Sequence, residues 1–378
     1  MKFNLISAEK DSRPVYITGN FNNWDPRDGD FQLEFLADGK YTIDIPDHLL
    51  PENIEYKFTK GGWENVEIDR YGNITHNRKI QKAEETEDIV EKWRENWAPF
   101  KKEYFPVIEL ISDEFAIPQL QKTRKIWALL PFNYYKSNRR YPVLYLQDAQ
   151  NLFHEGSEFG NWEIDRKLSL LAEYGRGEVI IIAIENGRQD RINEYILEPH
   201  ALAEDAEGKK YIRFLADTLK PYIDKMYRTQ PEREFTGIGG SSLGGLISIY
   251  GGFLYPEVYS KLMIFSPSLW VNPDYDFPMM NFKSPYKTRI YMYGGLKEGG
   301  EMAERMKEFE KRMEWSENQY SVQFEFRMSF NPEGAHQEFY WSQEFPRAVE
   351  WLFFDSGDDP KEFAEKAASA ANTDTENL

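Results

Sequence analysis

The pattern of hydrophobic and polar positions changes character along the chain. Up to about residue 81, apolar residues alternate with polar ones in short runs separated by turn residues, a pattern typical of half-buried strands. These runs are Pro14–Thr18, Phe31–Phe35, Tyr41–Ile45 and Ile54–Phe58. Asp38-Gly39 is a strong hairpin signal between two of them, and no helical period accompanies them. Residues 1–81 are therefore predicted to form a small all-β sandwich domain.

From about Phe105 onward, strand patterns alternate with helix patterns. Tyr141–Leu146 and Val179–Ile184 are continuous apolar runs, as expected of strands buried on both faces. The further predicted strands are Glu234–Ile238, Leu262–Phe265 and Arg289–Tyr293, and the predicted helices are Trp162–Leu171, Lys209–Tyr227, Leu243–Tyr255, Glu301–Trp315 and Phe339–Phe354. In the helix Glu301–Trp315, one apolar stripe predicts core packing, and it consists of Met302, Met306, Phe309 and Met313. The alternation predicts an α/β domain over residues 105–354 with a mainly parallel central sheet.

Two segments differ from both predicted domains. Residues 82–104 contain the acidic run Glu84–Asp88 and mixed features, which indicate a linker. Residues 355–378 carry seven acidic side chains against two lysines and many small residues, a composition typical of a flexible tail.

Composition and charge exclude several classes of function. The 378 residues include 46 Lys and Arg against 64 Asp and Glu, a net charge of −18. A phosphate backbone or an anionic membrane surface would repel such a chain, so neither nucleic acid nor a membrane is an expected partner. No apolar run approaches the roughly 20 residues that span a bilayer, and the N-terminal apolar run is too short for a signal peptide. These observations predict a cytoplasmic location.

The chain contains no cysteine, and its five histidines are not closely paired. Disulfides, thiolate nucleophiles and sulfur-based metal sites are therefore excluded, and a histidine metal site has no support in the sequence. We expect neither a metal ion nor another cofactor.

The segment Gly240-Ser241-Ser242-Leu243-Gly244 lies between a predicted strand and a predicted helix. This is the context of a nucleophile elbow, in which a sharp turn exposes a serine and the glycines leave room for it. Only Ser242 satisfies Gly-x-Ser-x-Gly. A dinucleotide fingerprint would need glycine at position 242, and a phosphate-binding P-loop would need a lysine. The remaining alternative is a tight turn with an incidental serine.

In this kind of site the partners follow in the order serine, acid, histidine. His336 is the one histidine after Ser242, so it is the predicted general base. Glu298, beyond the strand Arg289–Tyr293, is the predicted acid that orients it. Glu301 competes with Glu298, and Asp274 and Asp276 are further alternatives.

Backbone N–H groups should stabilise the oxyanion. One predicted donor is Leu243, and the second is Ala149 or Gln150 in the loop after Tyr141–Leu146. Side chains on other loops are candidate walls of a substrate pocket, with packing as the alternative reading, and these are Trp162, Asn186 and Trp270.

Several ordered motifs between Ile108 and Phe354 resemble the putative-esterase family, which includes enterochelin esterase-like proteins, feruloyl and acetyl-xylan esterases and human S-formylglutathione hydrolase. The motifs are Tyr141–Phe153, Gly240–Gly245, Phe265–Trp270, Tyr291–Glu298 and His336. The resemblance implies the α/β-hydrolase fold and a triad of Ser242, Glu298 and His336. The chain departs from the family pattern at Ala149, where relatives usually have glycine, and at Glu298, where many carry aspartate.

The N-terminal region resembles starch- and glycogen-binding carbohydrate modules. The matching segments are Gly19–Trp24, Glu55–Phe58, Trp63 and Asn77-Arg78. The resemblance implies that Trp24 and Trp63 stack on glucose rings of an α-glucan while Lys57 and Asn77 bind hydroxyl groups. The alternative is a sandwich that only braces the second domain.

These observations predict a serine carboxylic-ester hydrolase that works through an acyl-enzyme on a small-molecule ester or an esterified saccharide or glycoside. A siderophore-type, enterochelin-like esterase is the enzymatic alternative. A catalytically silent glycan-binding protein is the alternative from another class. The intact serine, acid and histidine in the right order argue against a silent domain.

Overall fold

The computed structural model describes residues 1–9, 12–37, 39–82, 85–96, 100–153, 157, 160–272, 274, 286–299, 301–317 and 322–354. The chain divides into two compact units, Met1–Lys101 and Lys102–Asp355. The predicted tail, residues 355–378, and the alternative acid Asp276 lie outside the described residues.

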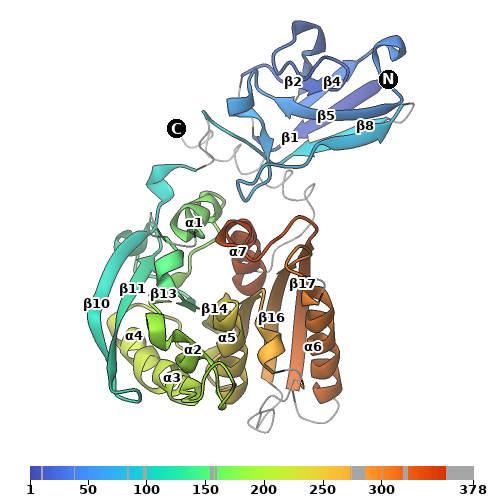
Figure 1. Ribbon diagram of the computed structural model, residues 1–378. Coiled ribbons are helices and arrows are strands. Elements are labelled where there is room, and N and C mark those ends of the chain that lie inside the picture. The colour runs from blue at the N-terminus through green and yellow to red at the C-terminus, as the bar shows by residue number, and fades with distance from the viewer. Residues whose placement is uncertain are drawn as a thin grey trace. The chain divides into compact units, whose positions relative to one another are not determined.

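The first unit is built from strands, as the alternating pattern predicts (Figure 1). In its described residues the strands are β1 (Lys2–Ser7), β2 (Tyr16–Gly19), β3 (Glu34–Ala37), β4 (Lys40–Asp44), β5 (Asn53–Thr59), β6 (Glu67–Ile68), β7 (Arg78–Gln81), β8 (Thr86–Val90) and β9 (Lys92–Trp93). They form sheets of order β3-β4-β1-β8, β2-β5-β7 and β6-β9. Phe3 of β1 and Phe58 of β5 are fully buried in one shared core, so the predicted all-β unit is confirmed.

The predicted linker, residues 82–104, is wrong in its first half. β8 pairs in parallel with β1, and β9 pairs with β6, so residues up to Trp93 belong to the first unit. Of the acidic side chains that suggested a linker, Asp88 has two partners within the unit. Asp88 accepts hydrogen bonds from Arg78 Nη1 at 3.1 Å and from the Tyr56 hydroxyl at 2.9 Å.

The second unit is centred on a sheet of order β10-β11-β13-β12-β14-β15-β16-β17. Its strands are β10 (Val107–Ile117), β11 (Lys122–Leu130), β12 (Val143–Gln147), β13 (Ile180–Ile184), β14 (Thr236–Ser241), β15 (Lys261–Phe265), β16 (Tyr286–Gly295) and β17 (Val322–Asn331). From β13 to β17 every neighbouring pair is parallel, whereas β10 and β11 pair antiparallel. The prediction of a mainly parallel sheet is confirmed.

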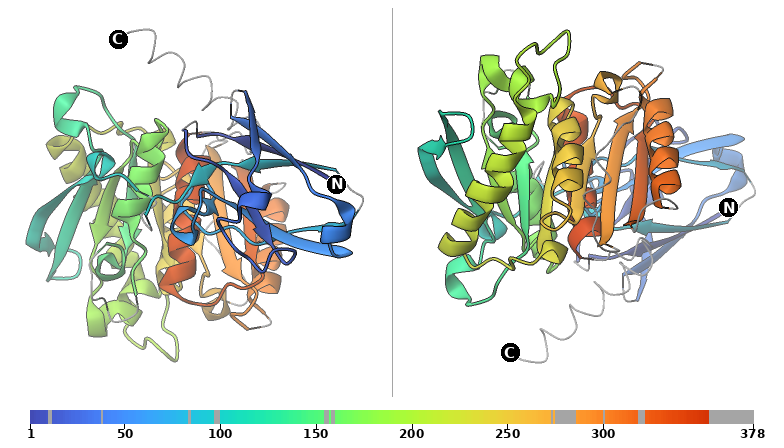
Figure 2. Two further views of the ribbon diagram at one scale, coloured as in Figure 1. Left: turned by 90° about the horizontal axis from the view of Figure 1, so that it is seen from above. Right: turned by 90° about the horizontal axis from the view of Figure 1, so that it is seen from below.

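Helices cover both faces of this sheet. They are α1 (Ile164–Glu173), α2 (Arg191–Tyr195), α3 (Gly208–Phe214), α4 (Lys220–Met226), α5 (Leu243–Leu254), α6 (Met302–Glu317) and α7 (Glu338–Phe353). α1 and α7 contact each other on one face, while α5 and α6 pack on the other, which Figure 2 shows from above and below. The helix predicted over Lys209–Tyr227 is α3 and α4 joined by a π-helical turn at Leu215–Leu219.

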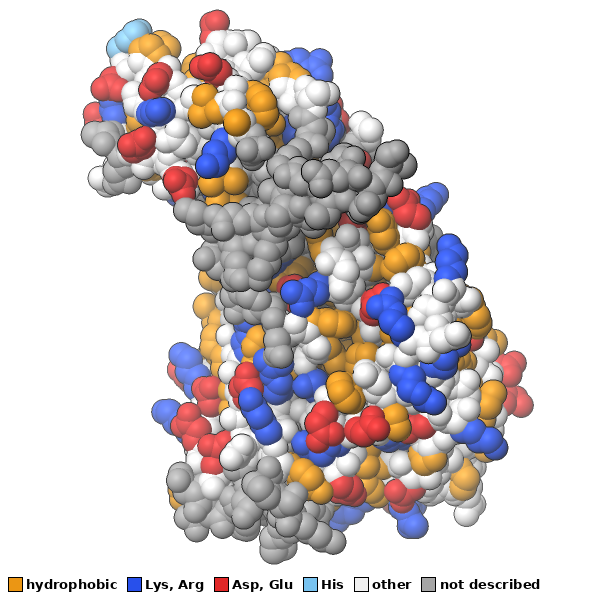
Figure 3. All heavy atoms as spheres, turned by 180° about the vertical axis from the view of Figure 1, so that it is seen from behind, with side chains coloured by type: hydrophobic (Ala, Val, Ile, Leu, Met, Phe, Trp, Pro, Cys, Tyr) orange, Lys and Arg blue, Asp and Glu red, His pale blue; other side chains and the backbone are white. Residues whose placement is uncertain are grey.

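The core of the second unit lies between the sheet and its helices. Met306, Phe309 and Met313 of α6 are buried there, which confirms the core reading of their stripe. On the described part of the face that Figure 3 shows, acidic and basic side chains of this unit are interspersed. None of the helices in the described ranges has the length and apolar character to cross a membrane.

Candidate active site

The polar residues of the site follow the carboxyl ends of the sheet strands. Asp148 follows β12, Ser242 follows β14, Ser268 follows β15, Glu298 follows β16 and His336 follows β17. Carboxyl ends of parallel strands lie at one edge of a sheet, where ligands of open α/β folds bind. The topology therefore gathers residues that lie far apart in the sequence.

Ser242 sits at a strained turn between β14 and α5. Its backbone angles are φ 56° and ψ −125°, a conformation that residues other than glycine rarely adopt. A Cβ on Gly240 would lie 2.9 Å from backbone atoms of Gly244, so the turn requires glycine there. The Ser242 N–H donates to the Phe265 carbonyl at 2.9 Å, and the Ser242 carbonyl accepts from the Ser268 N–H at 3.1 Å. These features match the predicted nucleophile elbow.

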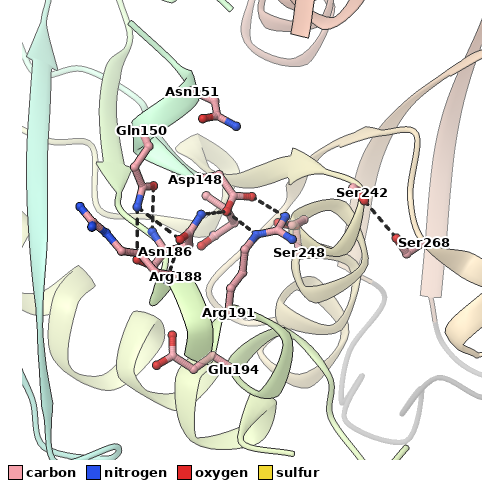
Figure 4. Close-up of polar contacts among 12 residues, drawn as sticks. Asp148, Gln150, Asn151, Asn186, Arg188, Arg191, Glu194, Ser242, Ser248 and Ser268 are labelled. Carbon is pink, nitrogen blue, oxygen red and sulfur yellow. Dashed lines mark hydrogen bonds and ion pairs between the residues drawn. The ribbon is translucent and has the colours of Figure 1, made fainter. Parts of the chain in front are cut away.

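Sequence reasoning missed a second serine beside Ser242. The two hydroxyls, Ser242 Oγ and Ser268 Oγ, lie 3.2 Å apart (Figure 4). Ser268 belongs to the Phe265–Trp270 motif, but that motif does not indicate where its hydroxyl points. The contact holds the Ser242 side chain in one position.

His336 pairs with Glu298. The distance from His336 Nδ1 to Glu298 Oε2 is 2.8 Å, and the imidazole packs edge-to-face on Trp341 with ring centroids 5.0 Å apart. An ionised carboxylate can only accept hydrogen bonds, so Nδ1 carries the hydrogen and Nε2 is left as the proton acceptor. The His336 side chain is 43% exposed, so Nε2 can be reached from solvent.

Glu298 is fully buried and held by three donors. Its Oε1 accepts from the Gly295 N–H at 2.7 Å and from the Ser266 hydroxyl at 2.6 Å. The Trp341 indole N–H in turn donates to Ser266 Oγ at 2.9 Å. Ser266, another residue that the sequence did not single out, thus fixes the carboxylate that faces His336.

The alternative acids lie elsewhere. Glu301 forms an ion pair with Arg305, one turn along α6, and its side chain is 70% exposed. Asp274 is exposed. Among the candidate acids that lie in the described residues, Glu298 is the one that pairs with His336.

The predicted oxyanion donors lie in two elements. Leu243 is the first residue of α5, where a helix leaves its N–H groups without partners of its own. The second element is the 3₁₀ turn Ala149–Asn151, whose own hydrogen bonds use the N–H groups of Asn151 and Leu152. The N–H groups of Ala149 and Gln150 are therefore not needed by the turn.

The three residues predicted to line a substrate pocket have different environments in the structure. Trp162 is 2% exposed and stacks on Phe265 with centroids 5.2 Å apart, so it is a packing residue and its pocket role is wrong. Asn186 is engaged with Asp148 and Gln150 rather than presented to a pocket. Trp270 is 48% exposed and lies two residues after Ser268, so it stays a candidate for substrate contact.

Asp148 and Arg191 form a buried ion pair beside the elbow. Arg191 Nε and Nη2 donate to the two oxygens of Asp148 at 2.6 and 2.9 Å. Burial alone would lower the pKa of the Arg191 guanidinium, but the Asp148 carboxylate raises it well above its usual value. Across the described residues, no cluster of three or more His, Cys, Asp or Glu side chains could hold a metal ion.

The four predicted carbohydrate-binding residues lie in the first unit. The rings of Trp24 and Trp63 are brought together, with centroids 6.4 Å apart and planes inclined by 38°, and both are partly exposed. Lys57 is buried and donates to Thr75 Oγ1 at 3.1 Å, and Asn77 donates to Glu55 at 3.4 Å. The structure therefore groups the tryptophans and gives the other two residues partners within the unit.

An α/β sheet with a serine at a strained elbow and an exposed histidine paired with a buried carboxylate at the same edge defines an α/β-hydrolase. The family model described as "Putative esterase" matches residues 117–352. The chain belongs to this family, and it is a carboxylic ester hydrolase.

Individual relatives agree with the fold. The chain is 24% identical to the uncharacterized protein YbbA of Bacillus subtilis over 240 residues, which are 61% of this chain and 92% of YbbA. It is similar to the solved structure of an IroE-like serine hydrolase from Shewanella oneidensis, with 20% identity, a TM-score of 0.51, and coverage of 67% of this chain and 82% of that one. The N-terminal region is 33% identical over 87 residues to an alpha-amylase of Niallia circulans, covering 22% of this chain and 6% of the amylase.

Proposed function

We propose that the second unit hydrolyses carboxylic esters through an acyl-enzyme, with Ser242 as nucleophile, His336 as general base and Glu298 as the acid that orients it. The observation that carries the proposal is the 2.8 Å contact between His336 Nδ1 and the buried Glu298 carboxylate. This contact leaves Nε2 as the proton acceptor at the sheet edge that also bears the strained Ser242.

The reaction has two halves. Ser242 Oγ attacks the acyl carbon while its proton moves to His336 Nε2, and the N–H groups of Leu243 and of Ala149 or Gln150 stabilise the oxyanion. The tetrahedral adduct then expels the alcohol, which takes the proton from His336. A water molecule, deprotonated by the same nitrogen, releases the acid and restores Ser242.

A fluorophosphonate probe tests the nucleophile. We expect one covalent adduct, located by mass spectrometry on Ser242, and no adduct on Ser242→Ala. Ser241→Ala is the matched control, because Ser241 is the neighbouring serine at the end of β14, and it should still be labelled. Esterase activity that survives in Ser242→Ala, or labelling at another serine, would overturn the proposal.

A panel of esters tests the substrate. We propose an esterified saccharide or glycoside as the substrate, because the chain joins the hydrolase unit to a module resembling glucan-binding modules. Acetylated and aroylated sugars should then be cleaved with a higher kcat/KM than p-nitrophenyl esters of the same acids. A preference for cyclic catecholate esters would instead support the siderophore-type alternative.

The first unit carries a second proposed function, the binding of α-glucan. The two partly exposed tryptophan rings support it, since flat aromatic faces stack on glucose rings. We expect retention on amylose that is lost in Trp24→Ala and in Trp63→Ala, with unchanged hydrolysis of p-nitrophenyl acetate. Phe35→Ala is the matched control, because Phe35 is another exposed aromatic residue of this unit, and it should still be retained. Equal retention of all variants would contradict glucan binding by the two tryptophans and favour the alternative that the unit only braces the second domain.

A further inference from the structure

The turn that carries one half of the proposed oxyanion hole begins at a strained residue. Asp148 has φ 61° and ψ 48°, the left-handed conformation, although it is not glycine. Such a conformation is unfavourable for a residue with a side chain and persists where surrounding contacts hold it. The contacts of Asp148 therefore bear on the position of the Ala149 and Gln150 N–H groups that follow it.

The Asp148 carboxylate is held from the neighbouring loop. Arg191, the first residue of α2, donates to both oxygens, and Asn186 Nδ2 donates to Oδ1 at 2.7 Å (Figure 4). The Asp148 side chain is 9% exposed. A bidentate arginine–carboxylate pair fixes orientation as well as distance, so the pair sets the direction in which the turn leaves β12.

Gln150 and Asn151, which follow Ala149 in the turn, are also held through their side chains. Gln150 and Asn186 bond reciprocally, with the Asn186 N–H donating to Gln150 Oε1 at 3.0 Å and Gln150 Nε2 donating to Asn186 Oδ1 at 3.3 Å. From the opposite side, Asn151 Nδ2 donates to Glu338 of α7 at 3.1 Å. The side chains of Asp148, Gln150 and Asn151 thus anchor the turn to the loop after β13, to α2 and to α7.

Asp148 also touches the element that carries the other predicted donor. A Cβ on Gly244 would lie 2.9 Å from Asp148 Oδ2, so the carboxylate rests against the first turn of α5, which begins at Leu243. We propose that Asp148 and Arg191 are positioning residues that keep the two halves of the oxyanion hole in fixed positions relative to each other. This proposal rests on the proposed function.

The charge of the pair adds a second consequence. The Asp148 carboxylate lies beside the place where negative charge develops during ester cleavage, and Arg191 neutralises it. Removing Arg191 alone leaves an uncompensated buried anion there, whereas removing the Asp148 charge leaves a cation. Arg191→Gln should therefore impair catalysis more than the nearly isosteric Asp148→Asn.

Steady-state hydrolysis of p-nitrophenyl acetate tests these steps in the full chain. For Asp148→Asn we expect kcat to fall about tenfold, and for Arg191→Gln about 100-fold, compared with about 100- to 1000-fold when an oxyanion donor itself is lost. KM should stay within about threefold, since only the transition state uses these N–H groups. The double variant Asp148→Asn with Arg191→Gln should regain about tenfold in kcat over Arg191→Gln, because the buried anion is gone.

An alkyl trifluoromethyl ketone gives a readout that general destabilisation would not move. Its adduct with the serine carries an oxyanion, so its affinity should weaken by the same factor as kcat/KM in each variant. Asp224→Asn is the matched control. Asp224 in α4 pairs with Lys220 at 2.6 Å and accepts from Thr229 at 2.7 Å, at the opposite edge of the sheet. It should keep kcat and inhibitor affinity.

Unchanged kcat in Asp148→Asn would overturn the proposal, and so would a loss confined to KM or an equal loss in Asp224→Asn. If Arg191→Gln fails to fold, which thermal unfolding will reveal, Asp148→Asn decides the question. Failure of the proposed function would be seen separately, as activity that survives in Ser242→Ala.

Discussion

Replacing Glu298 by glutamine should move the imidazole hydrogen of His336 from Nδ1 to Nε2. Oε1 of Glu298 accepts from the backbone N–H of Gly295 and from the Ser266 hydroxyl. A backbone N–H cannot become an acceptor, so the amide oxygen of Glu298→Gln must occupy this place. Its NH₂ group then takes the Oε2 position, 2.8 Å from His336 Nδ1 in the native structure.

The consequence for catalysis follows from that orientation. An NH₂ group donates, so Nδ1 must accept and the imidazole hydrogen moves to Nε2. In this tautomer Nε2 cannot take the proton of Ser242. The equivalent acid-to-amide change in a serine protease triad lowers kcat about 10⁴-fold, which corresponds to about 5.4 kcal/mol of activation free energy. We expect a loss of this size, measured as p-nitrophenyl acetate hydrolysis per folded molecule.

The matched control is Glu301→Gln. Glu301 is 70% exposed and pairs with Arg305 at the surface, so its change should alter kcat by less than about twofold. A Glu298→Gln variant within about tenfold of the native rate, with the same thermal unfolding midpoint, would refute the assignment of Glu298. Loss of activity in Glu301→Gln alone would transfer the role to Glu301.

Three further changes have defined outcomes. Gly240→Ala puts a Cβ 2.9 Å from Gly244 backbone atoms and should lower the free energy of unfolding in chemical denaturation by about 1–3 kcal/mol. Gly29→Ala is the control, because a Cβ there meets nothing within 4 Å, and it should be neutral or stabilising. Equal effects of the two changes would contradict the crowding at Gly240. Trp162→Ala should lower the free energy of unfolding by about 3–5 kcal/mol, and a loss below about 1 kcal/mol would contradict its packing on Phe265. Burial raises the pKa of the Glu338 carboxyl, so the folded state holds that proton more tightly than the unfolded state does and stability falls as the pH rises through this range. In urea denaturation, the free energy of unfolding of Glu338→Gln should therefore match that of the native protein below about pH 4 and exceed it by a growing amount above that pH; a difference independent of pH would contradict this.

In the second unit, the sequence predicted the strands β12 to β16 and missed β10, β11 and β17. β12 and β13 consist of apolar residues because helices cover both faces of the sheet, and such runs are easily read. β10 and β17 lie at the two ends of the sheet and mix apolar with charged residues. β8 was misread for the same reason, since it lies at the edge of its sheet and contains acidic residues, of which Asp88 pairs with Arg78.

Some residues of the site could likewise be predicted from the sequence, and others could not. Ser242, His336 and Glu298 could be predicted because a motif, a chain order and a strand end select them. Ser268, Ser266 and Arg191 could not, because their roles come from contacts between loops that only the fold brings together. Asn186 was read as a pocket wall for the converse reason. A polar side chain after a strand has the same sequence signature whether it faces a substrate or a neighbouring loop.

The two departures from the family pattern have local explanations in the structure. Ala149 lies within a 3₁₀ turn and is not among the residues with positive φ, so its Cβ is tolerated, and the left-handed conformation falls on Asp148 instead. Glu298 uses its extra methylene to reach in two directions, with Oε1 on the Gly295 N–H three residues earlier and Oε2 on His336. An aspartate at the same position would be one carbon shorter and could not make both contacts without moving the turn. The backbone conformation at Ala149 and the reach of Glu298 are therefore compatible with the residues that this chain carries at both positions.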